Sequence, residues 1–181
     1  MNVRMELLRE EHLQQIIEWR MRPDITRYMN TDPLLTLEGQ KKWLNKISND
    51  SSQKNWIINV DGIPSGLINV FDIDLINKRC SWGYYVGNLE VRSLKLATYL
   101  EWNLYEYVFE TLKLNKLCNE TFVLNSQVIQ MHKLCGGRED GVMRQHVFKN
   151  GEYFDVSVGS ILASEWEEKK QKTKFDRYNF E

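Results

Sequence analysis

The 181-residue sequence has few cysteines, no excess of either charge and no long apolar run. Its three cysteines, Cys80, Cys118 and Cys135, are widely separated and lack the close pairing of a zinc site or a redox CxxC motif. We therefore expect no metal, and we favour a buried packing role for Cys135 over a nucleophilic one. The reduced thiols fit a cytoplasmic location. No window approaches the roughly 18 apolar residues of a membrane span, and no export signal is visible, so no membrane partner is expected.

Basic and acidic residues nearly cancel, at 24 and 25. A protein that binds a phosphate backbone usually carries a basic surface, so nucleic acid is not an expected partner. With 42% hydrophobic and 27% charged residues, the composition is that of an ordinary globular protein. We predict a single domain over residues 1–163, followed by a charged, partly helical tail over residues 164–181.

The hydrophobic periodicity alternates between the repeats of strands and helices. The Asp61-Gly62 and Asn150-Gly151 pairs lie between apolar runs, as in β-hairpins. The expected elements are strands near residues 3–9, 56–60, 67–71, 80–86 and 117–124, a terminal hairpin around Asn150-Gly151, and helices near residues 13–20, 43–47, 97–108 and 127–134. This order predicts an α/β fold with a mixed sheet.

The strand end Tyr84-Tyr85-Val86-Gly87, followed by a polar loop and a long helix, is the segment best suited to hold a pyrophosphate. The N–H groups at a helix N-terminus are unpaired donors, and the helix dipole attracts anions there. The following residues, Arg92-Ser93-Leu94-Lys95-Leu96-Ala97, resemble the acetyl-CoA loop Arg/Gln-x-x-Gly-x-Gly/Ala of the GCN5-related N-acetyltransferase (GNAT) superfamily. Lys95 replaces the usual glycine and could offer a cation to the phosphates. The alternative is an ordinary helix start with solvated Arg92 and Lys95.

A second motif runs from Asn125 to Gly137 and resembles the family pattern Asn-x-x-Ala-Ile-x-Leu-Tyr-x-x-x-Gly-Phe. The resemblance implies the acyl-CoA N-acyltransferase fold, with about seven strands flanked by helices, and acetyl-CoA as co-substrate. It implies that Asn125 holds the pantetheine arm, and Lys133 is expected among the cofactor contacts. His132 occupies the position of the family's Tyr, which protonates the departing thiolate. The other interpretation of His132 is a half-exposed helix residue.

Transfer to an amine requires a proton acceptor, and Glu120 is the first candidate, five residues before Asn125, where relatives place a base. Asp72 and Asp74 are weaker candidates, and each acid could instead be a solvated or paired carboxylate. The family stabilises the oxyanion with a backbone N–H near Tyr85 or Val86. Because no Ser-His-Asp or Cys-His pattern is convincing, we expect direct attack in a ternary complex.

The segment from Glu18 to Met29, together with residues 56–58, 81–85 and 144–151, resembles the acetyltransferases of pseudaminic acid biosynthesis. Those enzymes acetylate the 4-amino group of UDP-4-amino-4,6-dideoxy-N-acetyl-altrosamine. Such an acceptor calls for cations facing a diphosphate and aromatic rings facing a base or sugar. The candidate substrate-binding residues are Arg20, Tyr28, Met29, Trp82 and Tyr84. Trp82 and one of the tyrosines could instead belong to the core.

Two other functions stay open. The first is a ribosomal-protein or peptide N-terminal acetyltransferase, which shares fold and cofactor and would be favoured by an acidic acceptor groove. The second is a non-catalytic acyl-CoA-binding module, motivated by Lys95 and His132 at two usual family positions. A homodimer is compatible with the sequence.

Overall fold

The computed structural model describes all of residues 1–181, and the chain folds into two compact units. The first unit comprises residues 1–73, 82–92 and 178–181. The second unit comprises residues 74–81 and 93–177. No helix has the length and apolar character needed to cross a membrane.

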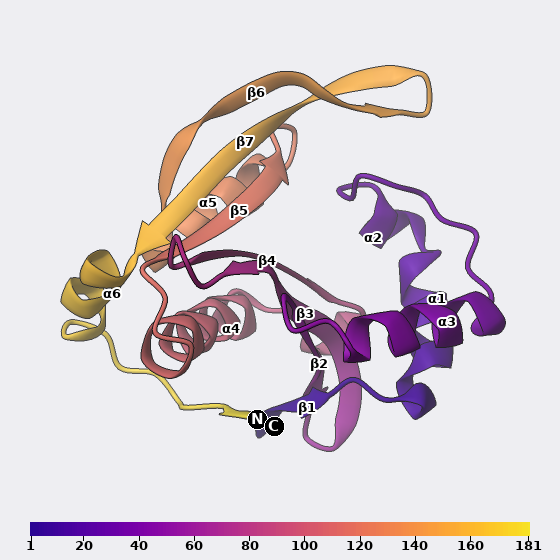
Figure 1. The fold of residues 1–181 in the computed structure, drawn as a ribbon, viewed down its shortest axis with the longest axis horizontal. Coiled ribbons are helices and arrows are strands. Elements are labelled where there is room, and N and C mark those ends of the chain that lie inside the picture. Colours follow the sequence, from indigo (N-terminus) through magenta and orange to yellow (C-terminus); the bar gives the residue numbers. More distant parts are fainter. The chain divides into compact units, whose positions relative to one another are not determined.

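Eight strands make up the β structure of the chain. They are β1 (Val3–Leu7), β2 (Lys54–Val60), β3 (Ile63–Asp74), β4 (Arg79–Val86), β5 (Lys116–Phe122), β6 (Arg138–Lys149), β7 (Glu152–Leu162) and β8 (Asn179–Phe180). Their hydrogen-bonded order is β6-β7-β5-β4-β3-β2-β1-β8, and Figure 1 labels β1 to β7. The sheet is mixed because β1–β8 and β4–β5 are parallel, whereas β1–β2 and β6–β7 are antiparallel. The predicted α/β fold is confirmed, and the short β8 adds to the expected strands.

In the first unit, β2 and β3 form the hairpin that the Asp61-Gly62 pair predicts. Asp61 and Gly62 have φ angles of 52° and 88°, the left-handed region that a two-residue hairpin turn requires. All residues of β2 after Lys54 are buried, so this strand lies inside the unit. The strand β8 pairs with β1 and forms the edge of the sheet in this unit.

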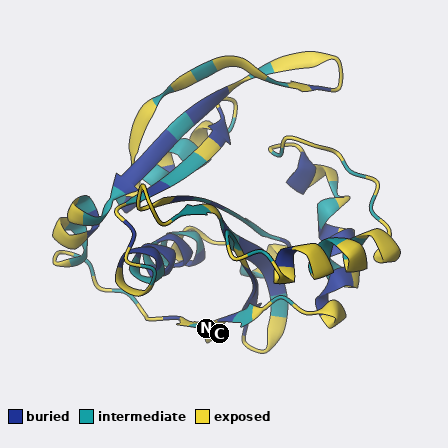
Figure 2. Ribbon diagram, viewed as in Figure 1, coloured by how far each residue is buried: buried dark blue, intermediate teal, exposed yellow.

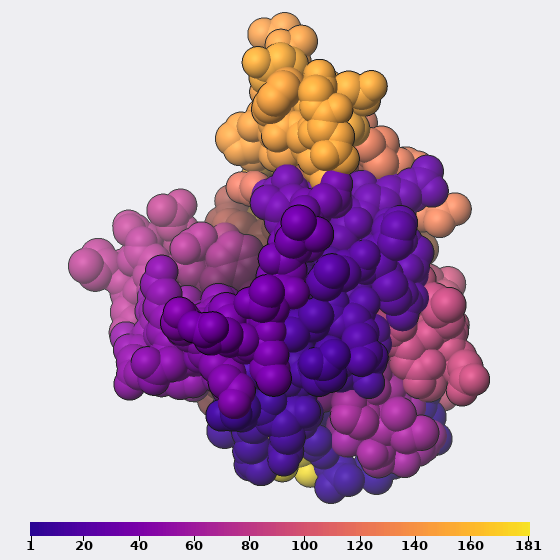
Figure 3. Space-filling model, turned by 90° about the vertical axis from the view of Figure 1, so that its right-hand side faces the viewer, coloured from indigo at the N-terminus to yellow at the C-terminus, as the bar shows by residue number.

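Three helices cover part of the first unit: α1 (Leu13–Arg20), α2 (Pro23–Thr26) and α3 (Leu37–Ser48). Pro23 occupies the first turn of α2, where its missing N–H costs no hydrogen bond. Leu13, Ile16 and Trp19 of α1 pack with Ile25 of α2, Ile57 of β2 and Leu67 of β3 in one buried cluster. In the space-filling view, the atoms of this N-terminal segment form a continuous surface coloured indigo to purple (Figure 3).

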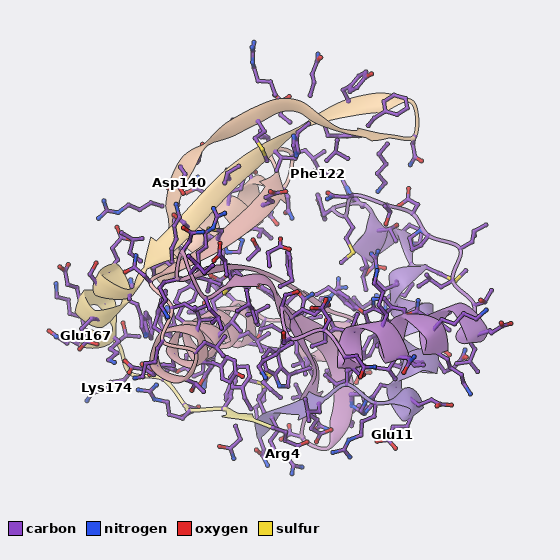
Figure 4. All side chains as sticks on the ribbon, viewed as in Figure 1. Arg4, Glu11, Phe122, Asp140, Glu167 and Lys174 are labelled. Atoms are coloured by element: carbon purple, nitrogen blue, oxygen red, sulfur yellow. The ribbon has the colours of Figure 1, made fainter.

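In the second unit, β7 pairs antiparallel with both β5 and β6, and the Asn150-Gly151 turn joins β6 to β7. Phe122 of β5 stacks on Phe154 of β7 with ring centroids 5.2 Å apart. Asp140 of β6 accepts hydrogen bonds from Lys116 and Ser160, and Figure 4 labels both Phe122 and Asp140. The C-terminal half of β7 is largely buried, whereas the turn between β6 and β7 is exposed (Figure 2).

The helices of the second unit are α4 (Leu94–Glu106), continued by a π-helical turn over Tyr107–Thr111, α5 (Ser126–Cys135) and α6 (Ala163–Lys170). Most of α6 lies in the segment expected to be a charged tail. Its Trp166 is only 1% exposed, donates to Glu106 of α4 and packs edge-on against Tyr105. Trp166, within the segment expected to be a tail, therefore belongs to the core of the second unit.

Candidate active site

In the first unit, β4 ends at Val86, and the next two residues are held by β3. The N–H groups of Gly87 and Asn88 both donate to the Ser65 carbonyl, at 2.7 and 3.0 Å. The ring of Trp19 lies so close to Gly87 that a Cβ on this residue would be 2.3 Å from it. Only glycine allows this approach, and it fixes the strand end that the sequence assigned to the acetyl-CoA site.

Arg92 follows this strand end and is bound to it. Its Nε donates to the Val86 carbonyl at 2.8 Å, and its Nη2 donates to Asp24 of α2 at 2.9 Å. Arg22 also pairs with Asp24, and it donates to the Gly87 carbonyl at 2.6 Å. The hydrogen bond from Arg22, reinforced by Arg92, lowers the pKa of Asp24 to about 2. Arg92 is thus placed at the predicted loop, where it supports the backbone of the strand end.

Arg20, at the end of α1, is a partly buried cation. Its guanidinium donates to the Met29 sulfur and, at 3.5 Å, to the Thr31 hydroxyl. Burial lowers the pKa of Arg20, while the nearby Tyr85 and Asp32 act in the opposite direction. Arg20 and Met29, two of the predicted acceptor residues, therefore lie in contact.

Tyr85 has a hydroxyl that is buried without a hydrogen-bond partner. Burial raises the pKa of Tyr85 well above its ordinary value, and Arg20 partly opposes this shift. A buried hydroxyl without a partner is unusual in a folded protein and is often found at functional sites.

The remaining predicted acceptor residues are aromatic. Trp82 and Tyr84 stack with ring centroids 5.7 Å apart and an angle of 8° between planes. Trp82 is 5% exposed, so Tyr84 is the member of this pair with more surface to offer a ligand. Tyr28 is 37% exposed and lies under the guanidinium of Arg27, 5.1 Å from its centroid.

In the second unit, the predicted pyrophosphate loop forms the N-terminus of α4. Ser93 is the N-cap, and its hydroxyl accepts the Leu96 N–H at 3.1 Å. The cap leaves the N–H groups of Leu94 and Lys95 in the first turn, where an α-helix supplies no partner. Ala97 already donates to the Ser93 carbonyl, and Leu96 is fully buried. The ammonium of Lys95 lies 5.3 Å from the ring centroid of Tyr99. Two free amides beside a cation suit a pyrophosphate.

The second motif forms the start of α5. Asn125 is the N-cap residue, but its side chain makes no capping hydrogen bond. Capping therefore does not engage this amide, and its contact with the pantetheine arm stays a prediction. Lys133, on the same helix, pairs with Glu139 at 2.8 Å and is already engaged.

His132 of α5 is hydrogen-bonded to a residue that the sequence analysis missed. Its Nδ1 lies 2.9 Å from Oε1 of Glu101 on α4. The other carboxylate oxygen of Glu101 accepts the Tyr105 hydroxyl at 2.7 Å. A signal was present in the sequence, because Glu101 lies next to Leu100 in the apolar stripe of this helix, where a charge requires a partner.

Glu120 lies on β5 and is exposed. It is opposite Val158 of β7, and its two neighbours in the strand, Asn119 and Thr121, are more buried than it is. An exposed carboxylate on a fixed strand can accept a proton from a bound amine, which is the role predicted for Glu120.

The mixed eight-stranded sheet flanked by helices is the fold of the acyl-CoA-dependent N-acyltransferases. Over residues 2–138 the sequence matches the acetyltransferase (GNAT) domain, and the chain belongs to this family. Its enzymes use acetyl-CoA, so acetyl-CoA is the co-substrate and the acceptor is an amine.

Individual relatives carry different names. YdaF of Bacillus subtilis, named only provisionally as a ribosomal N-acetyltransferase, is 29% identical over 110 residues, which cover 61% of this chain and 60% of YdaF. Acetyltransferase PseH of Campylobacter jejuni is 28% identical over 127 residues, or 70% of this chain and 76% of PseH. The crystal structure of spermidine N-acetyltransferase from Vibrio cholerae with CoA and spermine has a TM-score of 0.86 at 22% identity, covering 92% of this chain and 98% of that one. This last likeness supports the fold.

Proposed function

We propose that the chain transfers acetyl from acetyl-CoA to the 4-amino group of a UDP-linked amino-dideoxy sugar, in the cytoplasm. The observation that carries the proposal is the environment of Arg20. Both of its hydrogen-bond partners, the Met29 sulfur and the Thr31 hydroxyl, are neutral, and a thioether is a weak acceptor. A guanidinium has five N–H donors, so Arg20 keeps donors for an anionic ligand such as a diphosphate.

One carboxylate, that of Asp32, acts electrostatically on Arg20, but the cation itself and the pairing of Asp24 favour an anionic acceptor over a polycation. Asp24, the carboxylate at the start of α2, is neutralised by both Arg22 and Arg92. A polyamine would need carboxylates that are not already paired, because each ammonium group must be compensated when it leaves water. The aromatic rings of Tyr28 and Tyr84 add flat surfaces of the kind that a uracil or a sugar face requires.

The proposed reaction is a direct transfer. The lone pair of the amine attacks the thioester carbonyl, the C–S bond breaks, and the sulfur takes the electron pair. Glu120 accepts the proton that the amine loses, and His132 gives a proton to the sulfur. The amides of Leu94 and Lys95 and the side chain of Asn125 are the groups that we assign to acetyl-CoA binding.

A polyamine is the second candidate acceptor. This candidate is favoured by the similarity to spermidine N(1)-acetyltransferase of Escherichia coli, which is 22% identical over 158 residues and covers 84% of this chain. The PseH match favours the sugar at a higher identity over a shorter length. The two candidates differ in charge, so one assay can separate them.

The test measures CoA release with a panel of acceptors: the UDP-4-amino sugar, spermidine and an N-terminal peptide. We expect the UDP-sugar to be turned over with the highest kcat/KM. Arg20→Ala should raise KM for the UDP-sugar roughly 10- to 100-fold, equivalent to about 1.5 to 3 kcal/mol, because a charge-assisted contact is lost. KM for acetyl-CoA should stay nearly unchanged. Arg9→Ala, which removes an arginine whose side chain is 63% exposed, is the matched control. Turnover of spermidine or the peptide without turnover of the sugar would contradict the proposal.

A further inference from the structure

Glu101 is a fully buried carboxylate in the middle of α4. Its side chain is 0% exposed, and the His132 side chain that it contacts is 12% exposed. The stripe of α4 around it consists of Leu96, Leu100 and Leu104, all fully buried. An apolar residue would satisfy this stripe at no desolvation cost, so a charge at this position calls for a specific partner.

The groups that face Glu101 come from two helices. Tyr105 of α4 donates its hydroxyl, and the imidazole of His132 approaches from α5. Cys135 of α5 is also close, and burial, with the charge of Glu101 adding to it, raises the pKa of this thiol so that it stays protonated. Lys169 of α6 acts weakly on the same thiol, while its ammonium donates to the Leu134 carbonyl. His132 is thus the group in direct contact with Glu101 that can carry a positive charge.

The geometry determines which ring nitrogen is engaged. An ionised carboxylate can only accept hydrogen bonds, so with Glu101 in its ionised form the 2.9 Å contact places a proton of His132 on Nδ1. Proton exchange with any other group must then go through Nε2. In an imidazole held in this way, Nε2 is a donor when the ring is charged and an acceptor when it is neutral.

We propose that Glu101 is a positioning residue, which holds the proton of His132 on Nδ1 and thereby makes Nε2 the atom that protonates the departing CoA sulfur. The inference rests on the proposed role of His132 as the acid. As the C–S bond breaks, the sulfur takes the bonding electrons and then the Nε2 proton. The ring becomes neutral and its Nδ1–H stays hydrogen-bonded to Glu101, so Nε2 can be reprotonated from water before the next cycle.

The first measurement is the tautomer of His132, read from two-bond ¹H–¹⁵N correlations of the full-length protein at a pH where the ring is neutral. We expect the Nδ1–H tautomer in the wild type. It should be lost in Glu101→Met, which removes the carboxylate that accepts the hydrogen bond from Nδ1. Glu101→Gln keeps a carbonyl acceptor without the charge and is expected to retain the tautomer. It also serves as the second variant should Glu101→Met not fold. Glu106→Gln, five residues along the same helix, is the control and should leave the tautomer unchanged.

The second measurement is kinetic. Glu101→Met should lower kcat roughly 10- to 100-fold with little change in KM for acetyl-CoA, as expected for loss of a residue that orients a functional group. The same substitution should have little further effect on kcat in a His132→Phe background, because the two residues act as a unit. An equal loss in both backgrounds, or an unchanged tautomer in Glu101→Met, would overturn the inference. The tautomer of His132 does not depend on which amine accepts the acetyl group. Its measurement therefore tests the Glu101–His132 pair even if the UDP-sugar proposal fails.

Discussion

Arg92 and Asp24, which are 68 residues apart in the sequence, form an ion pair with 2.9 Å between Nη2 and Oδ2. The same arginine donates to the Val86 carbonyl, and Arg22 links Asp24 to the Gly87 carbonyl. The helix α2 is therefore tied to the end of β4 through one carboxylate. Through this network the short helix supports the end of β4.

Asp24→Asn should make the protein less stable at neutral pH but not in strong acid. The pKa of Asp24 is lowered from 3.8 to about 2, so its stabilising effect is present above its unfolded pKa and is lost as the pH falls toward 2. The side chain is 42% exposed, and screening by water should limit the effect to about 1 kcal/mol. Urea denaturation of both proteins between pH 2 and 7 measures the difference. A difference that stays constant down to pH 2 would exclude this ion pair as the cause.

Replacing Arg92 and Lys95 together by Ala should weaken acetyl-CoA binding and flatten its salt dependence. The Lys95 substitution removes a cation beside the first turn of α4, and the Arg92 substitution removes the hydrogen bond to the Val86 carbonyl. The attraction between a cation and a phosphate is screened by salt, so the wild type should lose affinity faster as ionic strength rises. Calorimetry at several salt concentrations measures this, with Lys42→Ala, whose side chain is 77% exposed, as the control. Unchanged affinity at low salt would remove both residues from the site.

Glu120→Gln should lower kcat roughly 10²- to 10⁴-fold and leave acetyl-CoA affinity nearly unchanged. A base acts on the amine in the transition state, so its loss affects turnover more than ground-state binding of the donor. Steady-state kinetics and equilibrium binding on the same sample separate the two effects. Glu152→Gln, at another exposed position in a strand, controls for loss of surface charge. Normal turnover at every pH would show that another group or water is the base.

Gly87→Ala should destabilise the protein by about 1 to 3 kcal/mol, the usual cost of forcing extra volume into a packed region. The added Cβ would lie 2.3 Å from the ring of Trp19, which is 4% exposed and has little room to move. Thermal unfolding measures the loss. Gly141→Ala is the matched control, since a Cβ there has no heavy atom within 4 Å. Equal stability of the two variants would show that Trp19 can shift without cost.

Much of the fold follows from local patterns in the sequence. The Asp61-Gly62 hairpin and the helices around residues 13–20 and 127–134 were predicted because each depends on neighbouring residues alone. The sequence predicts a charged, partly helical segment over residues 164–181, where most of α6 lies, but not the contacts of its buried Trp166 with Tyr105 and Glu106, some 60 residues earlier. Such contacts depend on tertiary packing and leave no periodic signal in a short charged segment.

The candidate site shows the same division. The positions of Ser93 at a helix start and of Asn125 before a second helix were recognised from motifs, which are local. The pairs Arg92–Asp24 and Glu101–His132 join distant segments of the chain. Arg92 and His132 were therefore predicted as site residues, but their partners were not. A charge within an apolar stripe was the one available sign that Glu101 would be paired.

The strand β8 affects the order in which the chain can fold during synthesis. The Glu181 N–H donates to the Met5 carbonyl, its carbonyl accepts the Trp56 indole N–H, and Phe180 packs edge-on against the same indole. A ribosome makes residues 179–181 after all the other strands, so β1 has no partner on this edge until then. Pairing over so long a sequence separation is slow to form, because a large loop must close first. The first unit therefore acquires its last strand only after residues 1–178 have been synthesised, and until then β1 is an open edge that chaperones or other nascent chains can reach.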